Sequence, residues 1–210
     1  MTIALDALMG LSPVIPVLVI EEEAHAVPLA RALAAGSVRA LEVTLRTPAA
    51  LAAIRAIARE VPEATVGAGT VLNARDLEAA AEAGARFIVS PGLTPELAEA
   101  AVAARLPFLP GVATATEIMR GLDLGLTRFK FFPAETSGGA AAVAAFGGPF
   151  PGLRFCPTGG ISAANASDYL KLANVACVGG SWLAPKEAVR ASDWVRMEAL
   201  ARAASQLRRD

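Results

Sequence analysis

Histidine and cysteine are scarce in this chain of 210 residues. It has one histidine, His25, and two cysteines, Cys156 and Cys177. One histidine cannot form a multi-histidine metal site, and two cysteines cannot supply a four-thiolate zinc site. We therefore expect no metal centre, and we interpret both cysteines as reduced residues of the core. A serine–histidine pair for nucleophilic catalysis could use only His25.

The chain also lacks an excess of charge of either sign. Its 19 Lys and Arg residues nearly balance 20 Asp and Glu residues, for a formal net charge of −1. Proteins that bind nucleic acids or anionic membranes have a basic excess or patch, so we expect neither kind of partner. The uncharged residues 136–153 are numerous enough to cross a bilayer, but five Gly and two Pro among them exclude a regular lipid-facing helix. The first residues lack the basic segment of a secretory signal and include Asp6, so we expect a cytoplasmic protein.

Eight short apolar runs alternate with Ala-rich segments along the chain. Near-continuous apolar runs are typical of strands that are buried on both faces of a parallel sheet. We expect strands at residues 14–20, 38–44, 65–69, 86–90, 106–110, 127–131, 153–157 and 174–178. The segments between them predict helices, for example at residues 48–60, 74–83, 95–104 and 186–207.

Eight strand–helix units of roughly 25 residues fill the chain and leave no room for a second domain. The sequence therefore predicts an α/β fold in which residues 1–210 form a single-domain (β/α)8 TIM barrel. Residues 1–11 are expected to form a short N-terminal helix that closes the bottom of the barrel. The alternative is a doubly wound open sheet, which has five or six strands and a glycine-rich turn after the first strand. Residues 20–23 contain no glycine, so we favour the barrel.

Lys130 has unusually apolar neighbours for a charged residue. It is one of three lysines, it ends a predicted strand, and Phe129, Phe131 and Phe132 lie around it. Catalytic residues of (β/α)8 barrels lie at the C-terminal ends of the strands. Burial disfavours the ammonium form, and a neutral lysine amine can attack a ketone to form a Schiff base. The alternative is a structural ion pair with Glu42 across the barrel.

Glu42 is an acid within the apolar run 38–44. A carboxyl group in such surroundings suits a residue that must both donate and accept protons. An ion pair with Arg46 or Lys130 is the alternative, although a neighbouring cation is also found beside active-site carboxylates. Arg46 itself offers a planar pair of donors that suits a carboxylate or a phosphate.

Two glycine pairs follow the last two predicted strands. Gly159 and Gly160 follow the seventh strand, and Gly179 and Gly180, together with Ser181, follow the eighth. Glycine lets backbone N–H groups approach an anion, and a helix that begins there adds favourable partial charge. Many barrels bind phosphate at these two loops, so we expect a phosphate site there. Tight turns alone are the alternative.

Six short segments of the sequence contain these candidate residues. They are L-E-V-T-L-R-T at 41–47, V-G-A-G-T-V-L at 66–72, S-P-G at 90–92, F-K-F-F-P-A at 129–134, F-C-P-T-G-G-I at 155–161 and G-G-S-W at 179–182. On these segments the chain resembles the bacterial 2-keto-3-deoxy-6-phosphogluconate (KDPG) and 4-hydroxy-2-oxoglutarate aldolases. This family consists of class I aldolases with a (β/α)8 barrel. The resemblance extends from about residue 11 to residue 182 and shows no departure at a functional position.

The resemblance implies a reaction and a role for each matching residue. The family cleaves KDPG into pyruvate and D-glyceraldehyde 3-phosphate, a step of the Entner–Doudoroff pathway. Lys130 would form the Schiff base with the C2 ketone and Glu42 would move protons, without a metal or another cofactor. The implied substrate contacts are Arg46 and Thr70 at the carboxylate, Pro91 and Phe132 at the pyruvyl group, Thr158 at the hydroxyls, and Gly159, Gly160, Gly179, Gly180 and Ser181 at the phosphate. Family members are typically homotrimers, so the resemblance implies a homotrimer as well.

Other substrates and reactions stay open on the sequence alone. The 6-phosphogalactonate epimer or 4-hydroxy-2-oxoglutarate could be preferred, although the galactonate branch of the family tends to lack a threonine at the position of Thr158. A phosphosugar isomerase could use Glu42 as a base, with Lys130 acting only electrostatically. A non-catalytic protein could bind phosphorylated sugar acids in the same pocket without converting them.

Overall fold

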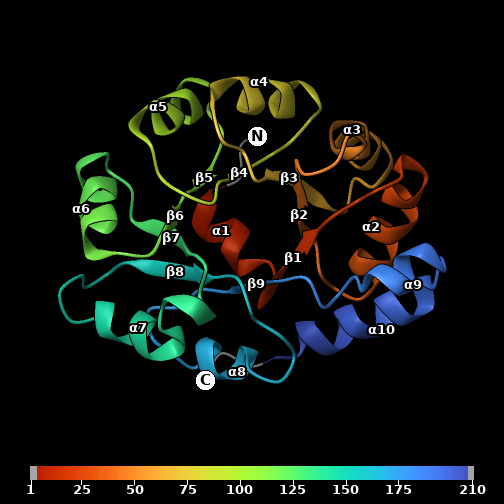
Figure 1. Ribbon diagram of the computed structural model, residues 1–210. Helices are drawn as coiled ribbons and strands as arrows, with labels where there is room; N and C mark the ends of the chain where they lie inside the picture. Colours follow the sequence, from red (N-terminus) through yellow and green to blue (C-terminus); the bar gives the residue numbers. More distant parts are fainter. Residues whose placement is uncertain (1–3, 208–210) are drawn as a thin grey trace.

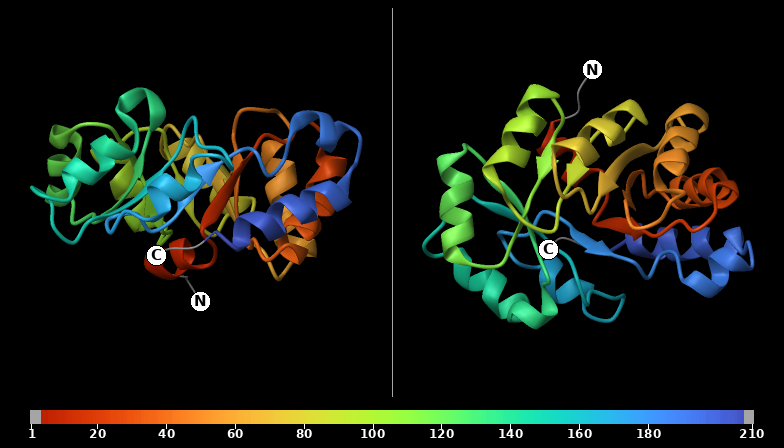
Figure 2. Two further views of the ribbon diagram at one scale, coloured as in Figure 1. Left: turned by 90° about the horizontal axis from the view of Figure 1, so that it is seen from below. Right: turned by 45° about the horizontal axis from the view of Figure 1, so that its top comes forward.

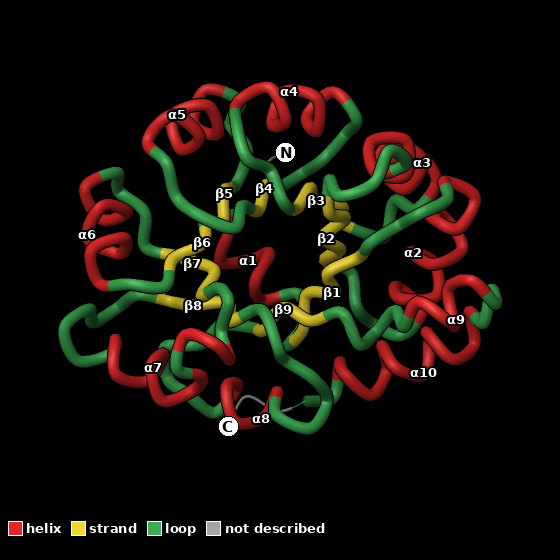
Figure 3. The backbone as a smooth tube through the Cα atoms, viewed as in Figure 1, coloured by secondary structure: helices red, strands yellow, loops and turns green. Residues whose placement is uncertain are grey.

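The computed structural model describes residues 4–207, and its strands form a ring that helices surround (Figure 1). Figure 3 shows the strands as the inner ring and the helices as the outer layer. Within these residues the strands are β1 (Val14–Leu18), β2 (Ala40–Thr44), β3 (Thr65–Gly69), β4 (Ile88–Val89), β5 (Phe108–Leu109), β6 (Gly111–Val112), β7 (Arg128–Phe131), β8 (Arg154–Pro157) and β9 (Val178–Gly180).

Helices follow most of the strands and cover the outside of the ring. Within residues 4–207 they are α1 (Leu5–Gly10), η1 (Glu23–His25), α2 (Ala26–Ala35), α3 (Ala50–Glu60), α4 (Ala74–Glu82), α5 (Pro95–Ala103), α6 (Ala115–Asp123), η2 (Glu135–Ser137), α7 (Gly139–Phe146), α8 (Ala166–Leu170), α9 (Lys186–Arg190) and α10 (Trp194–Ser205). No helix in this part of the chain is both long and apolar enough to cross a membrane.

All strand pairs in the described part of the ring are parallel. Six of them form one sheet in the order β5-β4-β3-β2-β1-β9, and three form a second sheet in the order β6-β7-β8. The two sheets join where β5 and β6 follow one another with only Pro110 between them. Isolated parallel bridges, Phe155 with Val175 and Thr158 with Gly179, link β8 to the segment that contains β9. The prediction of an α/β barrel is thereby confirmed.

Two predicted elements are interrupted in the structure. The strand expected at 106–110 breaks at Pro110, which has no N–H to donate to a sheet. The Pro110 carbonyl still accepts a hydrogen bond from the Lys130 N–H at 2.8 Å, and the chain continues as β6. The helix expected at 186–207 is two helices, because Ser192 has a left-handed φ of 54°. Asp193 then starts α10 by accepting a hydrogen bond from the Arg196 N–H at 3.1 Å.

The last strand lies later in the chain than the sequence predicts. It is expected at 174–178, whereas β9 consists of residues 178–180. Gly179 and Gly180 therefore belong to the sheet, where they pair with Ile15 and Pro16 of β1. Glycine is usually unfavourable within a strand, which is why the sequence indicates a loop at this position.

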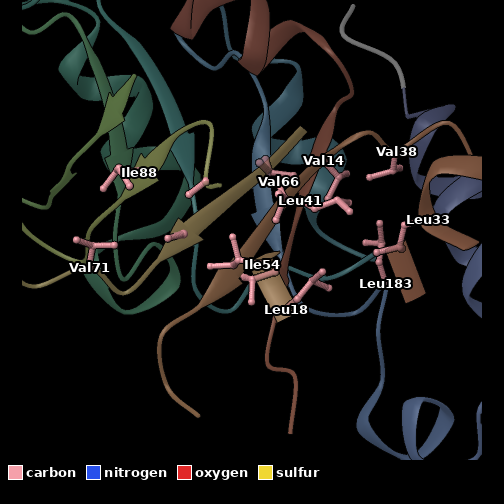
Figure 4. Close-up of a cluster of buried hydrophobic side chains, with 14 of the residues drawn as sticks. Val14, Leu18, Leu33, Val38, Leu41, Ile54, Val66, Val71, Ile88 and Leu183 are labelled. Carbon is pink, nitrogen blue, oxygen red and sulfur yellow. The ribbon is translucent and has the colours of Figure 1, made fainter. Parts of the chain in front are cut away.

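Apolar side chains pack in two layers, one on each side of the strands. The outer layer lies between strands and helices, and Figure 4 shows part of it, with Leu18 and Leu41 from strands beside Leu33 and Ile54 from helices. The inner layer lies within the ring and contains Leu8, Met9, Ile15, Ala40, Phe87, Val89, Leu109, Cys156 and Cys177. Strands buried on both faces account for the nearly continuous apolar runs in the sequence.

Helix α1 closes one end of the ring. It lies inside the outline of the ring in Figure 1 and at the edge of the barrel in the left view of Figure 2. Leu8 and Met9 are buried in the inner layer, and Asp6 forms an ion pair with Arg128 at the start of β7. The Nη2 atom of Arg128 is 3.0 Å from Oδ2 of Asp6. The predicted N-terminal helix is confirmed at residues 5–10, and residues 1–3 lie outside the described part. The C-terminal ends of the parallel strands are therefore at the opposite, open end.

Candidate active site

Lys130 and Glu42 meet inside the ring. The Nζ atom of Lys130 is 3.3 Å from Oε1 of Glu42, and the two side chains are 7% and 4% exposed. They come from β7 and β2, which lie on opposite sides of the ring in Figure 1. A buried charge is costly without a partner, and each group here supplies one for the other. The pair is the ion pair that the sequence left open, and its atoms are also close enough for proton transfer.

The alternation of side chains along β7 directs Lys130 into the ring. Phe129 and Phe131 are fully buried in the outer layer, against the helices. Because successive side chains of a strand point to opposite faces, Arg128 and Lys130 share the inner face. Arg128 contacts α1 at the closed end, and Lys130 lies one step closer to the open end. The Nζ atom of Lys130 is 5.2 Å from the centroid of the Phe132 ring.

Glu42 has room in the ring because Gly69 has no side chain. A Cβ atom on Gly69 would lie 2.6 Å from Cγ and 2.7 Å from Cδ of Glu42. The two residues belong to the paired strands β2 and β3, in which Glu42 is opposite Gly67. The sequence alone does not indicate a role for Gly69. A glycine within a strand can mark a close approach of another group, and that signal was present.

Arg46, Thr70 and Pro91 follow β2, β3 and β4 at the open end of the ring. Arg46 is exposed, and its guanidinium has no hydrogen-bond or ion-pair partner among residues 4–207. Thr70 is half-buried and has a left-handed φ of 58°. Pro91 is half-buried as well, and its carbonyl occupies the space that a side chain on Gly111 would need. These three residues and Lys130 thus lie after or near the C-terminal ends of four different strands.

Thr158 is buried, and Gly179 leaves space for it. The Oγ1 atom of Thr158 donates a hydrogen bond to the Cys156 carbonyl at 3.2 Å. A Cβ atom on Gly179 would lie 2.9 Å from Cγ2 and 3.1 Å from Cβ of Thr158. A Cβ atom on Gly180 would likewise overlap the Trp182 indole ring. Both glycines therefore have a packing role that does not depend on an anion.

The loops after β8 and β9 do not lead directly into helices. Gly159 and Gly160 form the loop after β8 with left-handed φ values of 100° and 79°. The helical segments expected after the two glycine pairs are present, but neither begins at the glycines themselves. Helix α8 begins only at Ala166 and α9 only at Lys186, while the exposed Ser181 directly follows β9. Backbone N–H groups of turns, rather than helix N-termini, are the groups available to an anion here.

A cavity of about 550 Å³ opens beside Arg46 and Ser181. Val17 of β1, His25 of η1, and Trp182 from the segment between β9 and α9 are part of its wall. The cavity therefore brings together two predicted site residues that are far apart in the sequence. One ligand could contact both of them.

Side chains that commonly bind metals are not gathered at this site. Cys156 and Cys177 are both buried in the inner apolar layer, as expected from the sequence. Within residues 4–207, no three or more His, Cys, Asp or Glu side chains are grouped so that they could hold a metal ion.

Three comparisons relate this site to known proteins. The sequence model of the KDPG and KHG aldolases matches residues 5–200. The KHG/KDPG aldolase of Escherichia coli is 56% identical over 199 residues, which are 95% of this chain and 93% of that protein. The structure of the Zymomonas mobilis KDPG aldolase with 3-phosphoglycerate has a TM-score of 0.93 at 54% identity, and the match covers 97% of this chain and 96% of that one. The Legionella pneumophila KDPG aldolase, with pyruvate captured at low pH as a covalent carbinolamine intermediate, has a TM-score of 0.93 at 47% identity and coverages of 96% and 98%.

Proposed function

Because the chain belongs to the KDPG and KHG aldolase family, we propose that it is a class I aldolase that cleaves KDPG into pyruvate and D-glyceraldehyde 3-phosphate. The observation that carries this proposal is the buried contact of 3.3 Å between Nζ of Lys130 and Oε1 of Glu42. A Schiff-base enzyme needs a nucleophilic amine with a proton-transfer group beside it. The carbinolamine of the Legionella relative supports the proposal, because it is the adduct that precedes a Schiff base.

In the proposed reaction, the neutral amine of Lys130 attacks the C2 carbonyl carbon of KDPG. Glu42 moves the protons that are needed to form the carbinolamine and to release water from it. The protonated Schiff base then accepts the electron pair of the C3–C4 bond while Glu42 takes the proton of the C4 hydroxyl. Glyceraldehyde 3-phosphate leaves, and protonation of the enamine at C3 and hydrolysis release pyruvate and restore Lys130. The iminium nitrogen is the electron sink, so this chemistry needs neither a metal nor another cofactor.

The remaining site residues bind the substrate in this proposal. A guanidinium pairs with a carboxylate through two parallel hydrogen bonds, which suits Arg46. The cavity beside Arg46 and Ser181 supports contact of one ligand with both residues, although neither Lys130 nor Glu42 lines it. The assignments are Arg46 and Thr70 to the carboxylate, Pro91 and Phe132 to the pyruvyl group, Thr158 to the hydroxyls, and Gly159, Gly160, Gly179, Gly180 and Ser181 to the phosphate.

A second substrate, 4-hydroxy-2-oxoglutarate, is supported by the relative from Escherichia coli, whose name includes both activities. This compound has no phosphate, so its cleavage would use Lys130 and Glu42 without the glycine loops. Thr158 supports the gluconate over the galactonate form of the phosphorylated substrate.

Residues 1–210 act as one barrel domain in this proposal, and the chain assembles as a homotrimer in the cytoplasm. The expectation of a trimer depends on the resemblance to the family. Light scattering of the purified protein gives its molar mass in solution, and a mass three times that of the 21.5 kDa chain is the expected result.

Trapping with borohydride tests the mechanism. Borohydride reduces a Schiff base to a stable amine, so incubation with pyruvate should leave one reduced pyruvyl group on Lys130. Intact mass and peptide mapping locate it. Lys130→Ala should give no adduct and no cleavage of KDPG, whereas Lys171→Ala, which removes an exposed lysine, should behave like the wild type. Folded wild-type protein that forms no adduct would rule the proposal out.

Two further outcomes identify the alternatives. A phosphosugar isomerase that uses Lys130 only for its charge would keep substantial activity in Lys130→Arg. A non-catalytic binding protein would bind phosphorylated sugar acids without releasing pyruvate from them. A Schiff-base aldolase should lose essentially all activity in Lys130→Arg, because a guanidinium does not form the imine.

A further inference from the structure

Hydrogen bonds join the segment after β7 to the loop after β8. The 3₁₀ helix η2 starts at Glu135, four residues beyond the end of β7 and five beyond Lys130. The N–H of Ala134 donates to the Thr158 carbonyl at 2.8 Å, and the N–H of Glu135 donates to the Gly159 carbonyl at 3.1 Å. The strand that carries Lys130 therefore leads directly to residues that hold the glycine loop.

The side chain of Glu135 packs against Gly160. A Cβ atom on Gly160 would lie 2.5 Å from Cγ and 2.7 Å from Cβ of Glu135, so only glycine fits there. Gly160 also has a left-handed φ of 79°, which disfavours residues with a side chain. The Gly160 carbonyl accepts a hydrogen bond from Nδ2 of Asn165 at 3.1 Å. Packing by Glu135 and the hydrogen bond from Asn165 together hold the loop at Gly160.

Tyr169 fixes the Glu135 carboxylate. Its hydroxyl donates a hydrogen bond to Oε1 of Glu135, and the tyrosine side chain is buried on α8. Burial and the carboxylate of Glu135 raise the pKa of Tyr169, so the hydroxyl stays protonated and keeps donating near neutral pH. The hydrogen bond links a buried tyrosine of the core to the residue that packs against the exposed Gly160.

We propose that Glu135 and Tyr169 are positioning residues that hold the Gly159–Gly160 loop in the shape that binds the substrate phosphate. The inference rests on the phosphate role proposed above for this loop. The two side chains act through the loop and not on the reacting atoms. Their loss therefore weakens binding of a phosphorylated substrate and leaves the reaction of Lys130 with pyruvate intact.

The test compares a phosphorylated ligand with one that has no phosphate. Steady-state kinetics with KDPG and borohydride trapping of pyruvate are measured for Tyr169→Phe, Glu135→Ala and Glu135→Gln. We expect the KM for KDPG to rise about tenfold in Tyr169→Phe and Glu135→Ala, the ratio that corresponds to losing one hydrogen bond to a charged group. In Glu135→Gln the KM for KDPG should rise less, about threefold, because the glutamine amide oxygen still accepts a hydrogen bond from Tyr169. The kcat for KDPG and the pyruvate dependence of trapping should stay within about twofold of the wild type.

Matched controls separate this role from a general loss of structure. Ser167→Ala changes an exposed residue of α8, and Glu99→Gln removes an exposed carboxylate elsewhere, so neither should alter the KM for KDPG. An unchanged KM in Tyr169→Phe would overturn the inference. A loss of pyruvate trapping as large as the loss of KDPG binding would also overturn it, because it indicates damage to the whole barrel. A lower KM for KDPG in Glu135→Gln would overturn it as well, because it indicates that the carboxylate repels the phosphate. Tyr169→Phe keeps nearly the same shape and provides the test if Glu135→Ala does not fold.

Gly160→Ala tests the phosphate role of the Gly159–Gly160 loop separately from the positioning role of Glu135 and Tyr169. If this variant leaves the KM for KDPG unchanged, the loop does not bind the phosphate and the positioning role is overturned with it. If Gly160→Ala raises the KM and Tyr169→Phe does not, only the positioning role is overturned. In both cases an adduct of pyruvate with Lys130 still supports the proposed aldolase.

Discussion

Gly69 of β3 lies so close to Glu42 of β2 that the space of its absent side chain is filled by the carboxylate. A Cβ atom at Gly69 would be 2.6 Å from Cγ of Glu42, well inside the distance at which two carbon atoms repel. The acid can therefore reach Nζ of Lys130 across the ring only while residue 69 is glycine. A residue without functional groups thus controls where the proposed proton-transfer group lies.

Gly69→Ala should inactivate the protein without unfolding it. The added methyl group displaces the Glu42 carboxylate from Lys130, and we expect kcat for KDPG to fall about 10²-fold, as on loss of general acid–base catalysis. Overpacking should cost about 1–3 kcal/mol of the free energy of unfolding, measured by urea denaturation. Gly10→Ala is the control, since a Cβ atom there meets no other atom within 4 Å. Activity near that of the wild type in Gly69→Ala would show that the position of Glu42 is not critical.

Glu42→Gln should remove proton transfer by residue 42 while keeping the size of its side chain. Glutamine has nearly the same size but cannot take up the proton of an incoming amine or hydroxyl, so single-turnover cleavage of KDPG should slow by about 10²–10⁴-fold. Rapid-quench measurement of pyruvate release gives this rate. Glu99→Gln, which changes an exposed carboxyl group, should leave it unaltered. If Glu42→Gln is as fast as the wild type, a group other than Glu42 transfers the proton.

Arg46→Lys should weaken carboxylate binding while the positive charge is kept. Lysine lacks the planar pair of donors, so the pyruvate concentration for half-maximal trapping should rise about tenfold. The final extent of trapping on Lys130 at saturating pyruvate should not change. Arg55→Lys provides the same substitution at an exposed position of α3. Equal pyruvate dependence in the two variants would exclude Arg46 from the carboxylate site.

Asp6→Asn should lower stability at neutral pH but not at low pH. The hydrogen bond and charge of Arg128 hold the pKa of Asp6 below its ordinary value. A carboxyl group with a lower pKa in the folded state stabilises the fold above its unfolded pKa of about 3.9, and this contribution is lost as the pH falls through the folded pKa. Asp6 is 66% exposed, so the effect at pH 7 should be below about 1 kcal/mol.

Urea denaturation across this pH range checks the prediction for Asp6. The free energies of unfolding of the variant and the wild type should begin to converge as the pH falls below about 4 and should become equal once the pH is below the lowered pKa of Asp6. Asp123→Asn, at the exposed end of α6, is the control and should match the wild type throughout. A difference that persists at the lowest pH would mean that the substitution disturbs α1 in some other way.

The candidate catalytic pair could be predicted because it breaks the local pattern of the sequence. Lys130 and Glu42 are charged residues inside apolar strands, and such residues are rare unless they are paired or functional. The barrel could be predicted for a related reason, since eight apolar runs in a chain of this length have few other arrangements. Both inferences use information that lies within a few residues of each position.

The contacts that support the site could not be predicted, because they join distant parts of the chain. Nothing in the neighbourhood of Gly179 shows that Thr158 needs its space, and the glycine pair indicated a loop where the sheet continues. The contact of Tyr169 with Glu135 bridges 34 residues. The break at Pro110 could have been anticipated, since proline cannot donate to a sheet.

Helix α1 also limits the directions from which water could reach a fragment bound to Lys130. Among residues 4–207, Leu8 and Met9 fill one end of the ring, which leaves the C-terminal ends of the strands as the entrance toward the buried Lys130. The loop proposed to hold the phosphate lies at that entrance, so the aldehyde fragment stands between the pyruvyl fragment and the solvent. The aldehyde must depart before water can reach and hydrolyse the bound pyruvate. In the proposed reaction, pyruvate, which stays covalently bound to Lys130 until hydrolysis, is therefore the last product to leave.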